Sequence, residues 1–123
     1  MTEPVDIAIH RDPRAPASAR RAIERFAESL DPQLVPDATL LVSELITNSV
    51  KYGGEGEVRL QLRSDHERHL RVEVVDQGSG FVPVARDRPA TDVGGWGLHL
   101  VETLSNRWGV HEGSTHVWFE IDR

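Results

Sequence analysis

The hydrophobic period of the chain changes from that of a helix to that of a strand after Gly54. The segments EVRLQLR (57–63) and HLRVEVVD (69–76) both alternate apolar and polar residues, as strands with one buried face do. The five residues between them, SDHER, suit a hairpin. Strands that meet directly in this way predict an antiparallel or mixed sheet.

Three further strands follow from the same pattern. VDIAIH (5–10) alternates, and RWGVHEG and STHVWFEID read as a final strand pair around Gly113. The order of elements is then β-α-α-β-β-loop-α-β-β. This order predicts an α+β fold, an α/β two-layer sandwich with a mixed, mainly antiparallel sheet and about three helices on one face. We expect residues 1–123 to form a single domain.

Helical periodicity appears in three places. Ser18 to Leu30 carries apolar residues at helical spacing. A second helix is predicted from Ala38 to Tyr52, with Asp37 as its N-cap and a stop at Gly53-Gly54. A third helix is predicted to begin in GWGLHLVETLSN.

Composition narrows the classes of function. The 123 residues contain no cysteine, so disulfides and thiolate chemistry are excluded. The net charge of −6 argues against nucleic acid as a direct partner. No apolar run approaches the ~20 residues that cross a bilayer, and no signal peptide is visible. We therefore expect a cytoplasmic protein without a membrane partner.

Five arginines lie within residues 11–25 of this acidic chain: Arg11, Arg14, Arg20, Arg21 and Arg25. One interpretation is a solvated helix face. The other is a contact surface for an acidic protein partner.

The second predicted helix has a polar stripe beside its core face. A helical wheel gathers Ala38, Leu41, Val42, Leu45, Ile46 and Ser49 in one arc, which predicts the core. Along its edge fall Asp37, Glu44, Asn48 and Lys51, and the middle two are neighbours at i and i+4. The stripe is either a solvated helix edge or one wall of a cleft.

Two glycine-rich loops follow. DQGSG (76–80) begins with an aspartate at a strand end, where a carboxylate can accept a hydrogen bond from a ligand amine. GGWGLHLV, from Gly94, places glycines before a helix, whose first amides suit phosphate. Either loop alone is equally consistent with a plain turn, because glycine also serves backbones with φ > 0.

The motifs taken together and in order are more specific. SELITNSVKYG, VVDQGSG, a breaker-rich loop, GWGLHLV and GSTHVWFE resemble the GHKL ATP-binding superfamily over nearly the whole chain. That superfamily includes the ATP domains of gyrase and histidine kinases. The chain is most similar to the small bacterial anti-sigma-factor serine kinases and their stand-alone ATP-binding relatives.

The resemblance implies a role for each matching residue. Glu44 matches the general base, and Asn48 matches the ligand of the Mg²⁺ that bridges the nucleotide phosphates. Asp76 matches the acceptor for the adenine amino group, and Thr115 a threonine near the adenine. The rest of the implied ATP-binding site consists of Lys51, Gly78, Gly80, Gly95, Gly97 and Leu98.

The loop 81–94 matches the ATP lid, and it is short for a gyrase or histidine-kinase lid, which favours the serine-kinase branch. Trp96 departs from the family pattern, and it either packs in the core or lid or touches nucleotide. Arg86 and Arg88 are either exposed or phosphate-binding. The histidines show no metal-ligand spacing and are expected to be structural.

Two functions from different classes remain. The first is an ATP·Mg²⁺-dependent serine/threonine protein kinase that phosphorylates a small antagonist protein and regulates a sigma factor, in a family where the kinase holds the sigma factor as a homodimer. The alternative is a non-catalytic ATP-binding regulatory module that acts through protein contacts.

Overall fold

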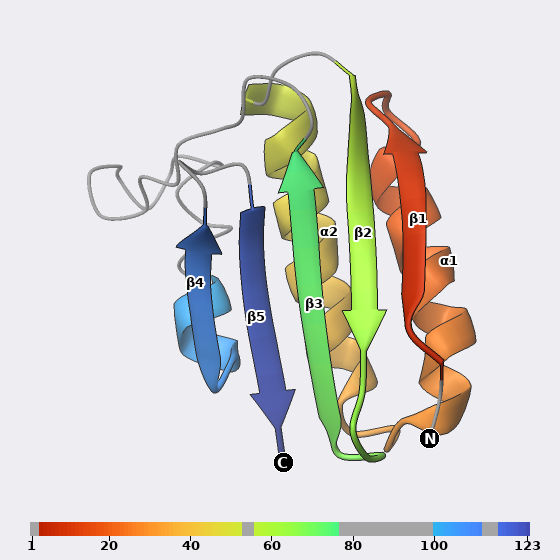
Figure 1. The fold of residues 1–123 in the computed structure, drawn as a ribbon, viewed down its shortest axis with the longest axis vertical. Helices are drawn as coiled ribbons and strands as arrows, with labels where there is room; N and C mark the ends of the chain where they lie inside the picture. Colours follow the sequence, from red (N-terminus) through yellow and green to blue (C-terminus); the bar gives the residue numbers. More distant parts are fainter. Residues whose placement is uncertain (1–2, 53–55, 77–99, 112–115) are drawn as a thin grey trace.

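The computed structural model describes residues 3–52, 56–76, 100–111 and 116–123 (Figure 1). Within these ranges, residues 100–104 are helical. The labelled elements are β1 (Val5–His10), α1 (Ala15–Phe26), the short 3-10 helix η1 (Ala27–Ser29), α2 (Val35–Tyr52), β2 (Glu57–Arg63), β3 (His69–Asp76), β4 (Arg107–His111) and β5 (His116–Asp122). The element order predicted from the sequence is confirmed within these ranges.

The strands form one five-stranded sheet in the order β1-β2-β3-β5-β4. All four pairings between described strands are antiparallel, so the sheet there is antiparallel rather than mixed. The predicted hairpin β2–β3 and the predicted strand pair β4–β5 are both present. The last strand of the chain, β5, lies inside the sheet between β3 and β4 (Figure 1).

The helices α1 and α2 cover one face of the sheet, behind the strands in Figure 1. Side chains alternate between the two faces of the sheet, and most of those that point to the helices are buried. They form one core with the helices. Its strand members are Ile9, Val58, Leu60, Leu62, Leu70, Val72, Val74, Val117, Phe119 and Ile121. The arc predicted on the second helix is also buried.

Two helix boundaries differ from the prediction. The first helix begins at Ala15 rather than Ser18, with Pro16 in its first turn, where the missing amide costs no hydrogen bond. The second begins at Val35, so Asp37 lies inside the first turn and is not the N-cap. Its carboxylate instead accepts a hydrogen bond from Arg123 Nη1 at 2.7 Å. An acidic residue in the first turn also complements the helix dipole.

Within the described residues, none of the helices combines the length and the apolar character that a membrane crossing requires.

Candidate functional site

Asp76 is the last residue of β3, and the alternation of that strand decides where its carboxylate points. Val72, Val74 and Asp76 share one side of the strand, and the two valines belong to the core. Asp76 therefore faces the helix layer, and it is 2% exposed. A carboxylate buried this deeply needs hydrogen-bond donors around it.

The facing element is α2. Asn48 is 3% exposed and Ser49 is fully buried, whereas Glu44 is half-buried and Lys51 is exposed. Glu44 and Asn48 lie one turn apart on the same side of the helix, as predicted. The residues of the polar stripe therefore differ in their exposure to solvent. Asn48 lies inside the protein and Lys51 lies in solvent.

Ser49 joins α2 to Asp76. Its hydroxyl Oγ donates to Asp76 Oδ2 at 3.1 Å. Helical periodicity places Ser49 on the core face of α2 and does not predict this contact. The available signal was its polarity, since Ser49 is the single polar member of an otherwise apolar arc and a buried hydroxyl requires a partner.

Arg11 is the second residue that sequence reasoning missed. Its Nη2 donates to Asp76 Oδ1, and its Nη1 donates to the Ser49 carbonyl oxygen and, at 3.1 Å, to Ser49 Oγ. The side chain is 9% exposed. The interpretation of residues 11–25 as a solvated helix face is therefore wrong for Arg11, which precedes α1. The other four arginines of that segment are exposed.

The remaining predicted site residues lie outside the described residues. These are Gly78, Gly80, Gly95, Gly97, Leu98 and Thr115, together with the predicted lid 81–94 and Trp96. Their roles stay predictions.

The donor set fits Mg²⁺ as far as it is described. The Asn48 amide and the Glu44 carboxylate offer oxygen atoms, which this hard ion prefers, and Mg²⁺ commonly takes only one or two protein ligands beside phosphates and water. Across the described ranges, no three His, Asp or Glu side chains form a ready-made metal cluster.

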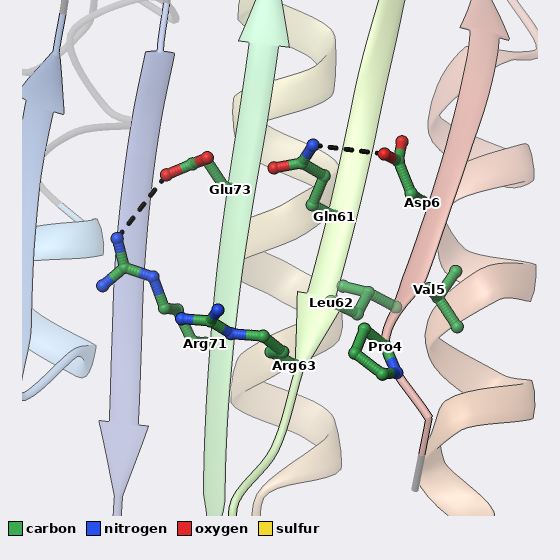
Figure 2. A pocket seen from close by; sticks show the side chains of 8 residues that line it. All are labelled: Pro4, Val5, Asp6, Gln61, Leu62, Arg63, Arg71 and Glu73. Carbon is green, nitrogen blue, oxygen red and sulfur yellow. Dashed lines mark hydrogen bonds and ion pairs between the residues drawn. The ribbon is translucent and has the colours of Figure 1, made fainter.

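The opposite face of the sheet carries a pocket of about 360 Å³ near the N-terminal end of β1. Figure 2 shows Asp6, Gln61, Arg71 and Glu73 on this helix-free face, where Gln61 pairs with Asp6 and Arg71 with Glu73. Asp76 points to the other side of the sheet. The pocket is therefore separate from the candidate site.

Glu120 is the centre of a charged cluster on the same helix-free face. Arg107 Nη2 and Arg71 Nη1 donate to its two oxygens at 2.9 and 2.8 Å. His69 Nδ1 accepts from the Asp65 amide, so Nε2 carries the proton and donates to Glu120 Oε2 at 3.1 Å. The hydrogen bond from Arg107 is the main cause that lowers the pKa of Glu120 from 4.5 to about 2; those from His69 and Arg71 add to it, and partial burial opposes it.

This cluster predicts a loss of stability in acid. Because the pKa of Glu120 is lowered in the folded state, its contribution is complete above pH ~4.5 and is lost as pH falls toward ~2. We expect the melting temperature of wild type to exceed that of Glu120→Gln at pH 6 and the difference to shrink steadily between pH 4.5 and 2. Glu67→Gln, an exposed change in the β2–β3 loop, is the control for net charge. A difference independent of pH would contradict the assignment.

A family model described as histidine kinase-like ATPase domain matches residues 9–121. The anti-sigma F factor of Clostridium botulinum (strain Eklund 17B / Type B) is 31% identical over 102 residues, which cover 72% of this chain and 70% of that protein.

The serine-protein kinase RsbW of Listeria monocytogenes serovar 1/2a is 34% identical over 86 residues. That alignment covers 58% of this chain and 55% of the kinase, so the match spans about half the length of this relative. Among solved structures, the RsbU and RsbW domains of Rv1364c from Mycobacterium tuberculosis match with a TM-score of 0.70. The match covers 98% of this chain and 31% of that one at 17% identity, and it supports the fold alone.

Proposed function

Because the chain belongs to the histidine kinase-like ATPase domain family, we propose that it binds ATP with Mg²⁺ and phosphorylates a serine or threonine of a small antagonist protein. Its similarity to a serine-protein kinase and to an anti-sigma F factor supports this activity. The function is then to control the availability of a sigma factor.

The observation that carries the proposal is the buried carboxylate of Asp76 at the end of β3. It faces the segment of α2 that holds Asn48, and Ser49 donates to it. A buried carboxylate can accept a hydrogen bond from the 6-amino group of adenine, and hydrogen bonds of that kind select strongly for ligands that carry the donor. In the proposed complex, Asp76 recognises the adenine base through this hydrogen bond. The glycines that follow it, Gly78 and Gly80, lie against the nucleotide.

Glu44 and Asn48 are the proposed catalytic pair. Asn48 contributes its amide oxygen to Mg²⁺, which when bound supplies charge neutralisation for the phosphates. Glu44 takes the proton from the attacking hydroxyl. This role requires a carboxylate within reach of the substrate, and Glu44 is half-buried rather than enclosed in the core. Positioning of the two reactants supplies most of the remaining catalysis in phosphoryl transfer.

The proposed protein partners are the antagonist and a sigma factor. The exposed arginines of and beside α1 (Arg14, Arg20, Arg21 and Arg25) offer a basic surface on an acidic chain and suit an acidic partner. A homodimer is part of the same proposal.

ATP binding without phosphoryl transfer to any antagonist would favour the alternative, a non-catalytic regulatory module.

Calorimetric titration with ATP, in the presence and absence of Mg²⁺, tests the nucleotide site. Asp76→Asn is expected to weaken ATP binding by about tenfold to a hundredfold, because a hydrogen bond to a charged group contributes ~1.5–3 kcal/mol. Mg²⁺ is expected to strengthen binding to wild type.

Asp6→Asn is the matched control, because it removes a carboxylate that pairs with Arg59 at 2.7 Å on the helix-free face. Its ATP affinity should equal that of wild type. Equal ATP affinity in Asp76→Asn would remove Asp76 from the site.

A further inference from the structure

Arg11 contacts the candidate site from the corner between β1 and α1. Its guanidinium reaches Asp76 with one terminal nitrogen and Ser49 with the other. Both side chains are buried, that of Arg11 at 9% and that of Asp76 at 0% exposed. The planar guanidinium reaches the two residues with separate nitrogens of one rigid fork, whereas a lysine ammonium offers a single point of charge.

The corner that carries Arg11 is held by local hydrogen bonds. The Asp12 amide donates to the His10 carbonyl at 3.0 Å, and the Ala15 amide donates to the Asp12 carbonyl at 3.0 Å. The Asp12 carboxylate also accepts from the Arg14 amide at 2.7 Å. Arg11 is thus presented from a fixed turn, which limits the positions that its long side chain can take.

The two oxygens of Asp76 have different donors. Oδ1 accepts from Arg11 and Oδ2 accepts from Ser49. A carboxylate held at both oxygens cannot rotate about its last bond without losing one of these hydrogen bonds. These two hydrogen bonds therefore fix the plane of the carboxylate, which offers about four acceptor sites in all.

We propose that Arg11 is a positioning residue of the adenine site, which orients the Asp76 carboxylate toward the 6-amino group and so sets the preference for adenine. This inference rests on the proposed function, because it assigns Asp76 the same role. Arg11 acts through Asp76 and makes no contact with the nucleotide in this proposal. Its effect therefore falls on the choice of base and not on the triphosphate.

The test compares ATP with the analogue that lacks the 6-amino group, purine riboside triphosphate, by calorimetry on the full chain. Wild type is expected to prefer ATP by about tenfold or more. Arg11→Lys keeps the buried positive charge and loses the fork, so its preference for ATP should fall to about threefold or less while the analogue binds as in wild type. Arg11→Gln is the second variant if lysine prevents folding.

Arg59→Lys is the matched control. Arg59 donates from Nε and Nη2 to Asp6 Oδ1, at 3.0 and 2.7 Å, on the helix-free face. This variant removes the same kind of fork from an Arg–Asp pair, and its preference for ATP should match that of wild type.

The other outcomes separate the two proposals. Equal losses of affinity for both nucleotides in Arg11→Lys would make the residue purely structural and overturn the inference. An undiminished preference for ATP would also overturn it and leave the proposed function standing. A wild type that binds both nucleotides equally would remove Asp76 from adenine recognition and overturn the inference. A wild type that binds neither would overturn the proposed function itself.

Discussion

Replacing Glu44 with glutamine is expected to slow phosphoryl transfer by about 10²- to 10⁴-fold, the usual contribution of a general base. ATP affinity should change by less than about threefold, because glutamine preserves the shape and polarity of the side chain and loses only its ability to take a proton. The measurement is single-turnover transfer from labelled ATP to a candidate antagonist protein, with affinity measured separately by calorimetry. A selective loss of rate is the signature of a group that acts in the transition state.

Glu67→Gln is the control for this experiment, because Glu67 is an exposed glutamate in the β2–β3 loop, outside α1 and its arginines. Its rate should equal that of wild type. An unchanged rate in Glu44→Gln would contradict the role of general base. It would support the other interpretation of the polar stripe, in which Glu44 lies on a solvated helix edge. A parallel loss of rate and affinity would instead place Glu44 among the residues that bind the nucleotide.

Replacing Phe119 with alanine is expected to lower the free energy of unfolding by about 3–5 kcal/mol. Phe119 is fully buried in β5, where it pairs with Val72 on one side and Trp108 on the other. Truncation leaves a cavity in the core beneath β5, which lies between β3 and β4. Since a domain of this size is stable by only ~5–15 kcal/mol, the loss is a large fraction of the total.

Urea unfolding followed by circular dichroism measures this loss as a shift of the midpoint at constant slope. Leu40→Ala is the control, because Leu40 lies on α2 with 41% of its surface exposed. Surface changes of this kind usually stay within about ±0.5 kcal/mol. A midpoint for Phe119→Ala that matches the control would show that Phe119 is not a core residue.

The strands were predicted more accurately than the helix ends. The ranges 5–10, 57–63 and 69–76 coincide with β1, β2 and β3, because alternation over six to eight residues is set by which side chains are buried. The two helix starts were placed three residues too late. Several neighbouring residues suit a first turn, including Pro16 and Asp37, and a local signal does not choose among them.

The candidate site was predicted in part. Helical spacing alone placed Glu44 and Asn48 together, and the end of a predicted strand singled out Asp76. The family pattern then joined the three in one expected site. The burial of Asn48 and the exposure of Lys51 were not predictable, because a helical wheel gives directions and not the depth of the surrounding protein. Arg11 was grouped with its neighbouring arginines because nothing in its local sequence distinguishes it.

The sequence by itself determined the local order of this protein: which segments are strands, which helix face is buried and which residues share a turn. These properties depend on side chains a few positions apart. Only the tertiary structure decided that β5 lies between β3 and β4 and that Arg11 meets Asp76, a residue 65 positions away. Contacts of that range arise when the sheet closes against its helices, and the free energy that selects them comes from the packing of the whole core rather than from any local pattern.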